Sequence, residues 1–130
     1  MSRRAALPVE AVSITPGYSW RLDLDILFAG ERPNDWPEWT VRMHVWNDCG
    51  SIRFTLQNGS GVTVEEVADL PGADAPVMIP VIRLTGQQTK GFKTTPVNYL
   101  IDLTAPGGDA EDYFFGTFQV VPGPPLELIA

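Results

Sequence analysis

The sequence predicts an all-β fold, an antiparallel β-sandwich of roughly seven strands, with a closed barrel as the alternative. Apolar and polar residues alternate along several segments, which indicates strands because successive side chains of a strand point to opposite faces. Turn-forming residues separate these segments about every eight to twelve residues. No segment has the spacing of an amphipathic helix, so we expect helix in under about a tenth of the chain.

Length and composition indicate a single domain over residues 1–130, with 44% apolar and 19% charged residues. This is a globular composition and not that of a disordered chain. The net charge of −7 argues against a nucleic-acid partner, since phosphate binding depends on clustered Lys and Arg. The apolar runs are far shorter than the roughly 20 residues that cross a bilayer, so no membrane partner is expected.

The first strands are predicted by alternation. Residues 18–28 carry apolar or aromatic side chains at every even position and predict a strand with one buried face. Residues 30–37 are dense in turn formers and predict a loop. Residues 39–46 predict the next strand, with His44 and Trp46 on the face opposite its main apolar residues.

Two turns rich in Asn and Gly follow. Residues 47–50 (NDCG) predict a hairpin into a strand at 51–57, because Asn, Asp and Gly suit tight turns. Residues 58–61 (NGSG) predict a second hairpin into a strand at 62–67. Each turn therefore joins antiparallel neighbours in the predicted sheet.

The second half begins with a continuous apolar run at 77–84, typical of a strand covered on both faces. Pro80 has no N–H for a ladder and suggests an edge strand or a bulge there. Thr85 and Gln88 have capping-box spacing and predict one helical turn within 85–90.

The last predicted strands are 97–103 and 113–121, joined by a turn at 105–112. The proline-rich segment 122–130 cannot continue a ladder and is predicted to be a tail. From the apolar strand faces we expect a core that includes Trp20, Leu22, Leu24, Val41, Phe54, Tyr99, Ile101 and Phe118.

No catalytic residue, metal site or cofactor is predicted. His44 is the only histidine, and it lies in mid-strand, whereas catalytic residues usually occupy loops or strand ends. The Asp23 and Asp25 pair fits the solvent face of a strand, and the acidic cluster at 109–112 matches no complete calcium loop. Cys49 is the only cysteine, so the chain forms no internal disulfide, and we expect a free thiol in an exposed turn.

The tryptophans and the tail are the candidate contact residues. Trp36 lies in a predicted loop and Trp46 on the face opposite the core, so both are predicted to be exposed at a protein interface. The tail adds three apolar interface candidates, which are Leu126, Leu128 and Ile129. Alternatively, Trp36, Trp39 and Trp46 form a platform for sugar rings, although Trp39 also fits a core position.

The order of these elements resembles a known family. The relevant segments are YSWRLDLDILF, PNDWPEWTVRMHV, LTGQQTKGF before VNYLIDLTAPGGD, and a closing FFGTFQVVPG. They are similar to the immunoglobulin-like domains of tailed-bacteriophage tail and baseplate proteins, of the type at the N-terminus of baseplate upper proteins. The resemblance covers residues 14–123.

The resemblance implies an immunoglobulin-like β-sandwich and a non-enzymatic structural role in the virion, associated with the tail or baseplate. The implied partners are other virion proteins and further copies of the same chain, assembled in the host cytoplasm. Two alternatives stay open at this point. One is a carbohydrate-binding or receptor-binding module, and the other is a capsid decoration protein.

Overall fold

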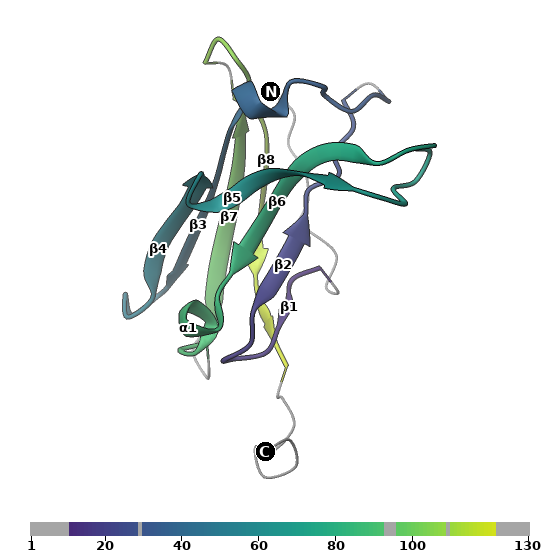
Figure 1. The fold of residues 1–130 in the computed structure, drawn as a ribbon. Helices are drawn as coiled ribbons and strands as arrows, with labels where there is room; N and C mark the ends of the chain where they lie inside the picture. Colours follow the sequence, from purple (N-terminus) through teal and green to yellow (C-terminus); the bar gives the residue numbers. More distant parts are fainter. Residues whose placement is uncertain (1–10, 29, 93–95, 109, 122–130) are drawn as a thin grey trace.

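The fold is all-β, as predicted. A computed structural model describes residues 11–28, 30–92, 96–108 and 110–121. Seven strands form one sheet in the order β2-β6-β5-β4-β3-β7-β8, and β1 pairs with β9 in a separate two-stranded sheet (Figure 1). The strands are β1 (Ser13–Ile14), β2 (Trp20–Asp23), β3 (Thr40–Asn47), β4 (Arg53–Asn58), β5 (Gly61–Val67), β6 (Val77–Leu84), β7 (Val97–Thr104), β8 (Ala110–Thr117) and β9 (Gln119–Val120).

The seven-stranded sheet curls at the join between β4 and β5. These strands share only two residue pairs, Gln57 with Gly61 and Asn58 with Val62, and they pair in parallel. The curl places β5, β6 and β2 in one layer and β4, β3, β7 and β8 in the other (Figure 1). Their inner faces enclose one apolar cluster, whose largest fully buried members include Trp36, Tyr99, Phe92, Leu24, Met43 and Ile101.

The turn at 47–50 forms the predicted hairpin between β3 and β4. The second predicted hairpin is wrong, because β5 continues past β4 and pairs antiparallel with β6. Gly61 makes this corner possible: its φ is +92°, and a Cβ there would lie 2.6 Å from Leu56 Cδ2. Asn-Gly turns suit hairpins and corners alike, and here the burial of Val62 opposite Ile82 favours the corner.

Strand β6 is interior, so the edge or bulge predicted from Pro80 is wrong. A residue in an antiparallel ladder directs its N–H and C=O to the same neighbour. The Pro80 carbonyl accepts from the Leu24 N–H at 2.9 Å, so the proline nitrogen also faces β2, which ends at Asp23. The missing N–H of Pro80 therefore removes no hydrogen bond between β6 and β5. Burial on both faces is confirmed, with Ile79 and Val81 on one side and Ile82 and Leu84 on the other.

The two longest predicted strands, at 18–28 and 113–121, end at other residues than expected. The ladder of β2 ends at Asp23, yet the alternation of burial continues through Leu24 and Ile26, whereas Tyr18 is exposed. The final strand divides at Phe118, whose N–H bonds to the Val97 carbonyl at 2.8 Å. Beyond that residue the chain leaves β7 and pairs in parallel with β1, a strand that the sequence pattern did not predict.

Two helical turns complete the described chain, η1 (Trp36–Glu38) and α1 (Gly86–Thr89). The capping box of α1 is confirmed: the Thr85 hydroxyl accepts from the Gln88 N–H, and the Gln88 side chain accepts from the Thr85 N–H. The predicted core is also confirmed except at Phe54, which is half-buried against the main cluster.

Candidate functional site

The outer face of the β4-β3-β7-β8 layer carries Trp46, one of the candidate contact residues. The ladder registers arrange its outward side chains in three rows across the strands, which are Arg53, Trp46, Asn98 and Thr117; Thr55, His44, Leu100 and Phe115; and Gln57, Arg42, Asp102 and Tyr113. Trp46 lies on this face, as predicted, but it is half-buried and not exposed. Together with Leu100, Tyr113 and Phe115 it forms a diagonal line that we call the aromatic band.

The aromatic band joins β3, β7 and β8. Phe115 is 38% exposed, and its ring centroid lies 6.0 Å from that of Tyr113. Leu100 sits directly opposite Phe115 in the β7–β8 ladder and is half-buried. The band therefore offers partly exposed apolar side chains on a rigid sheet, where surfaces that bind other proteins are commonly rich in aromatic residues.

A polar ladder borders the aromatic band. The two ring nitrogens of His44 lie 3.1 Å from the Thr55 hydroxyl and 3.2 Å from an Asp102 carboxylate oxygen, and Arg42 donates to the other Asp102 oxygen at 3.1 Å. Because a carboxylate only accepts, we place a proton on His44 Nε2. The backbone around His44 is hydrogen-bonded in the ladders with β4 and β7. Its N–H groups therefore do not form an oxyanion hole. The arrangement fits a cross-strand ladder better than a catalytic triad.

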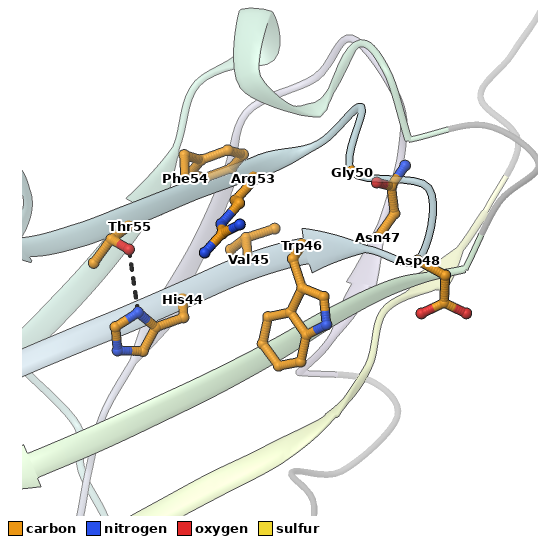
Figure 2. Close-up of a pocket in the computed structure, with 9 residues that line it drawn as sticks. All are labelled: His44, Val45, Trp46, Asn47, Asp48, Gly50, Arg53, Phe54 and Thr55. Carbon is orange, nitrogen blue, oxygen red and sulfur yellow. Dashed lines mark hydrogen bonds between the residues drawn. The ribbon is translucent and has the colours of Figure 1, made fainter.

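A surface hollow of about 460 Å³ lies at the end of this face, where β3 turns into β4 (Figure 2). Trp46 and His44 project from β3, while Arg53 and Thr55 come from the paired positions of β4. The buried Asn47 holds the turn, since its side chain donates to the Ser51 hydroxyl and accepts from a backbone N–H. The residues that line the hollow are thus set by a hairpin and not by a long loop.

Cys49 occupies the same turn as an exposed free thiol, as predicted. Its sulfur lies 3.2 Å from the Ser51 hydroxyl. Hydrogen bonding from Ser51 lowers the pKa of the Cys49 thiol from its ordinary value. The thiol is therefore readier to ionise than a free cysteine, although it is not among the residues that line the hollow.

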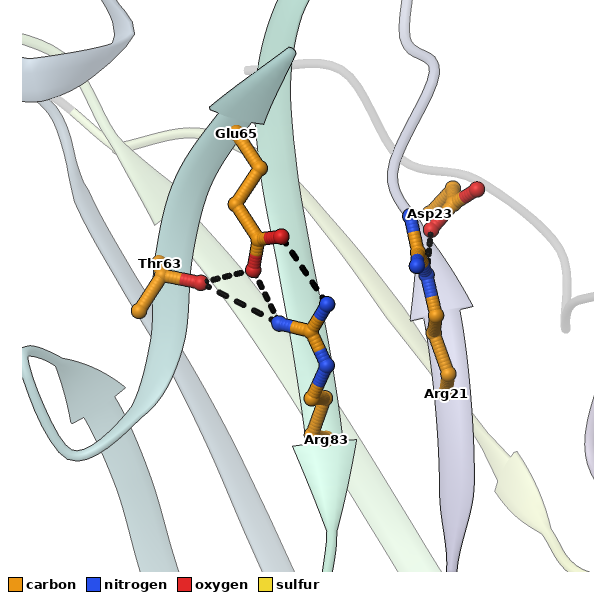
Figure 3. A network of polar contacts seen from close by, with 5 residues as sticks. All are labelled: Arg21, Asp23, Thr63, Glu65 and Arg83. Atoms are coloured by element: carbon orange, nitrogen blue, oxygen red, sulfur yellow. Dashed lines mark hydrogen bonds and ion pairs between the residues drawn. The ribbon is translucent and has the colours of Figure 1, made fainter. Parts of the chain in front are cut away.

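The outer face of the β2-β6-β5 layer has a different character (Figure 3). Arg83 donates to both carboxylate oxygens of Glu65 and also reaches the Thr63 hydroxyl. The Arg83–Glu65 pair spans the cross-strand row between these two residues, which consists of Thr63 and the fully buried Val81. The hydrogen bonds from Arg83 and Thr63 lower the pKa of Glu65 to about 2. This layer therefore carries an internal ion pair across its outer face.

Trp36 was expected at an interface, and that expectation is wrong because the side chain is only 1% exposed. It begins η1, and residues three apart lie above one another in a 3₁₀ turn. Trp36 and Trp39 accordingly face the same way, with ring centroids 4.8 Å apart, and both are buried in the core. The predicted three-tryptophan sugar platform is wrong for the same reason, and only Trp46 remains partly exposed.

The tail candidates Leu126, Leu128 and Ile129 lie outside the described residues. The sequence did not single out Arg53, Leu100 or Phe115 as candidate contact residues. The period of two was the available signal for all three, because each lies on its strand between residues of the buried face. The pattern does not show which outward-facing residues of different strands become neighbours, because that depends on the strand order.

Comparison with protein-family models, with curated proteins and with solved structures finds no match for this chain. No helix of the described residues is long and apolar enough to cross a membrane. The same residues contain no group of three or more His, Cys, Asp or Glu side chains that could hold a metal ion.

Proposed function

We propose that this chain is a non-enzymatic structural domain of a bacteriophage virion, an immunoglobulin-like β-sandwich that assembles in several copies at the tail or baseplate. The resemblance of its segments to that family supports the proposal. Those segments overlap with β2, β3, β7 and the β8–β9 pair. The strand order also puts β2 beside β6 and β3 beside β7, with the two layers closed over one core.

The aromatic band is the observation that carries the assembly role. It lies on a four-stranded layer whose backbone is fixed by ladders, so ordering it on binding costs little conformational entropy. The outer face of the other layer carries the Arg83–Glu65 ion pair in place of aromatic residues. We therefore assign the contact with neighbouring virion proteins to the β7–β8 side of the aromatic band, with Trp46 at its margin.

The test is incorporation into particles. Phe115→Glu places a charge in the aromatic band, and burying that charge at an interface is unfavourable. The matched control is Met78→Glu, because Met78 is also a large apolar residue, 49% exposed, on the other layer. Both variants should keep the circular dichroism and the unfolding midpoint of the parent protein.

We expect Phe115→Glu to be lost from purified particles while Met78→Glu is incorporated like the parent protein. Immunogold labelling of the particles then locates the domain, and label on the head would indicate capsid decoration in place of a tail or baseplate role. Normal incorporation of Phe115→Glu contradicts the assignment of the interface. Absence of the parent protein from particles contradicts the virion role itself.

A further inference from the structure

We propose that the hollow at the β3–β4 turn binds a sugar acid, a pyranose that carries a carboxylate. The hollow combines an arginine that has no ion pair among the described residues with a partly exposed tryptophan in the next strand. Its volume of about 460 Å³ is within the usual range for small-ligand sites. The proposal goes beyond the assembly role, because it concerns the β3–β4 end of the face and not the β7–β8 side.

Arg53 supplies the first part of the chemistry. It is exposed and makes no ion pair with any described residue. Every other arginine in the described part of the chain pairs with a carboxylate, namely Arg21 with Asp23, Arg32 with Asp25, Arg42 with Asp102 and Arg83 with Glu65. In a chain with a net charge of −7, an arginine that pairs with no carboxylate of the described residues is available for an anion from outside. A planar guanidinium suits a carboxylate because it can donate two parallel hydrogen bonds.

Trp46 supplies the second part. It sits directly opposite Arg53 in the ladder, and both side chains project into the same hollow (Figure 2). An indole ring is flat, apolar and rigid, and the C–H face of a pyranose is also flat and apolar. Stacking of the sugar ring on Trp46 therefore leaves its carboxylate within reach of the neighbouring strand, where Arg53 lies.

The remaining lining residues favour a sugar over an acidic peptide. Asp48 is exposed at the turn side of the hollow, and Thr55 lies at the opposite side beside His44. A carboxylate such as that of Asp48 accepts hydrogen bonds from sugar hydroxyl groups but repels a second acidic side chain. The site thus offers one cation for one carboxylate, an aromatic surface for the ring and acceptors for hydroxyl groups.

The experiment is a nuclear magnetic resonance titration of the ¹⁵N-labelled full chain. The probes are tri-galacturonic acid and 3′-sialyllactose, which represent the two common sources of sugar carboxylates, and the methyl ester of tri-galacturonic acid is the uncharged match. The indole N–H signal of Trp46, assigned with Trp46→Phe, and the backbone signals of the β3–β4 turn should shift saturably with at least one acid. The acid that binds identifies the source.

Arg53→Gln should weaken binding of that acid by about tenfold or more, the loss expected for a hydrogen bond to a charged group. The matched control Arg21→Gln removes an exposed arginine from the other layer and should bind like the parent protein. The methyl ester should also bind at least about tenfold more weakly than the acid.

Several results overturn the proposal. These are equal binding of acid and ester, unchanged binding by Arg53→Gln, or shifts centred away from the β3–β4 turn. Hexaglutamate binding as tightly as the sugar acid would show a general anion site. No saturable shift with either acid up to about 10 mM, roughly ten times a weak Kd of about 1 mM, would show that the hollow binds neither. All of these readouts use the isolated chain, so they are independent of incorporation into particles.

Discussion

Thr89 offers the sharpest test of how the fold is held at its α1 end. The side chain is fully buried, and its hydroxyl donates to the Tyr18 carbonyl at 2.8 Å while accepting from the Gly17 N–H at 3.0 Å. These bonds join α1 to the loop between β1 and β2 across more than 70 residues of chain. The two segments approach closely, since a Cβ on Gly86 would lie 2.5 Å from the Gly17 carbonyl oxygen.

Thr89→Val keeps the shape of the side chain and removes the hydroxyl, which leaves two backbone groups without their partner. A buried group that loses its hydrogen bond costs about 1–3 kcal/mol. The Gly17 N–H and the Tyr18 carbonyl are in partly buried hydrogen bonds, so we expect Thr89→Val to lower the free energy of unfolding by about 2–4 kcal/mol in total. Thr89→Ser is the control. It keeps the hydroxyl and loses one buried methyl group, for which we expect about 1 kcal/mol.

The assay is urea unfolding at 25 °C followed by tryptophan fluorescence, with the free energy of unfolding from linear extrapolation. The expected order of stability is parent, then Thr89→Ser, then Thr89→Val. A Thr89→Val protein within about 0.5 kcal/mol of the parent would refute the reasoning, because that difference is typical of unremarkable surface substitutions. A Thr89→Ser protein less stable than Thr89→Val would show that packing and not hydrogen bonding decides this site.

Two further predictions concern the corner and the ion pair. Gly61→Ala should lower the free energy of unfolding by about 1–3 kcal/mol, because alanine disfavours a φ of +92° and its Cβ would meet Leu56 at 2.6 Å; an unchanged unfolding midpoint contradicts the corner geometry. The pKa of Glu65 is lowered to about 2 from an ordinary 4.5, so ionised Glu65 stabilises the fold above about pH 4.5 and that contribution is lost as the pH falls towards 2. The stability difference between parent and Glu65→Gln, measured by thermal unfolding from pH 6 to pH 2, should therefore shrink over this interval, and a difference that stays constant would count against the Arg83 contact.

The buried faces could be predicted from sequence because burial in a sheet follows a period of two. In residues 18–28 the alternation correctly identified Trp20, Leu22, Leu24 and Ile26 as buried, even though the ladder of β2 ends at Asp23. The apolar pattern reports which side of the chain faces the core, and not where backbone pairing stops. The capping box of α1 was predictable for a similar reason, since it depends on residues only three apart.

Features that depend on strand order were not predictable. Pro80 is tolerated in an interior strand because its nitrogen faces the place where β2 has ended, which no local pattern contains. Trp36 is buried because a 3₁₀ turn aligns it with Trp39, whereas the surrounding prolines and polar residues suggested an open loop. The pairing of Arg53 with Trp46 requires the register of β3 against β4. Candidate sites formed across strands therefore need the structure.

The parallel pairing of β1 with β9 determines how the domain would carry mechanical load. The Gln119 N–H bonds to the Val12 carbonyl at 3.0 Å, and the Val121 N–H bonds to the Ile14 carbonyl at 2.8 Å. Because the two strands run in the same direction, the chain enters at one end of this pair and leaves at the other. Tension along the chain would pull β1 and β9 past each other in shear. The hydrogen bonds between them would then be loaded together and would not break one after another. The rate of forced unfolding would then depend on the β1–β9 pair and would be largely separate from the equilibrium stability of the core.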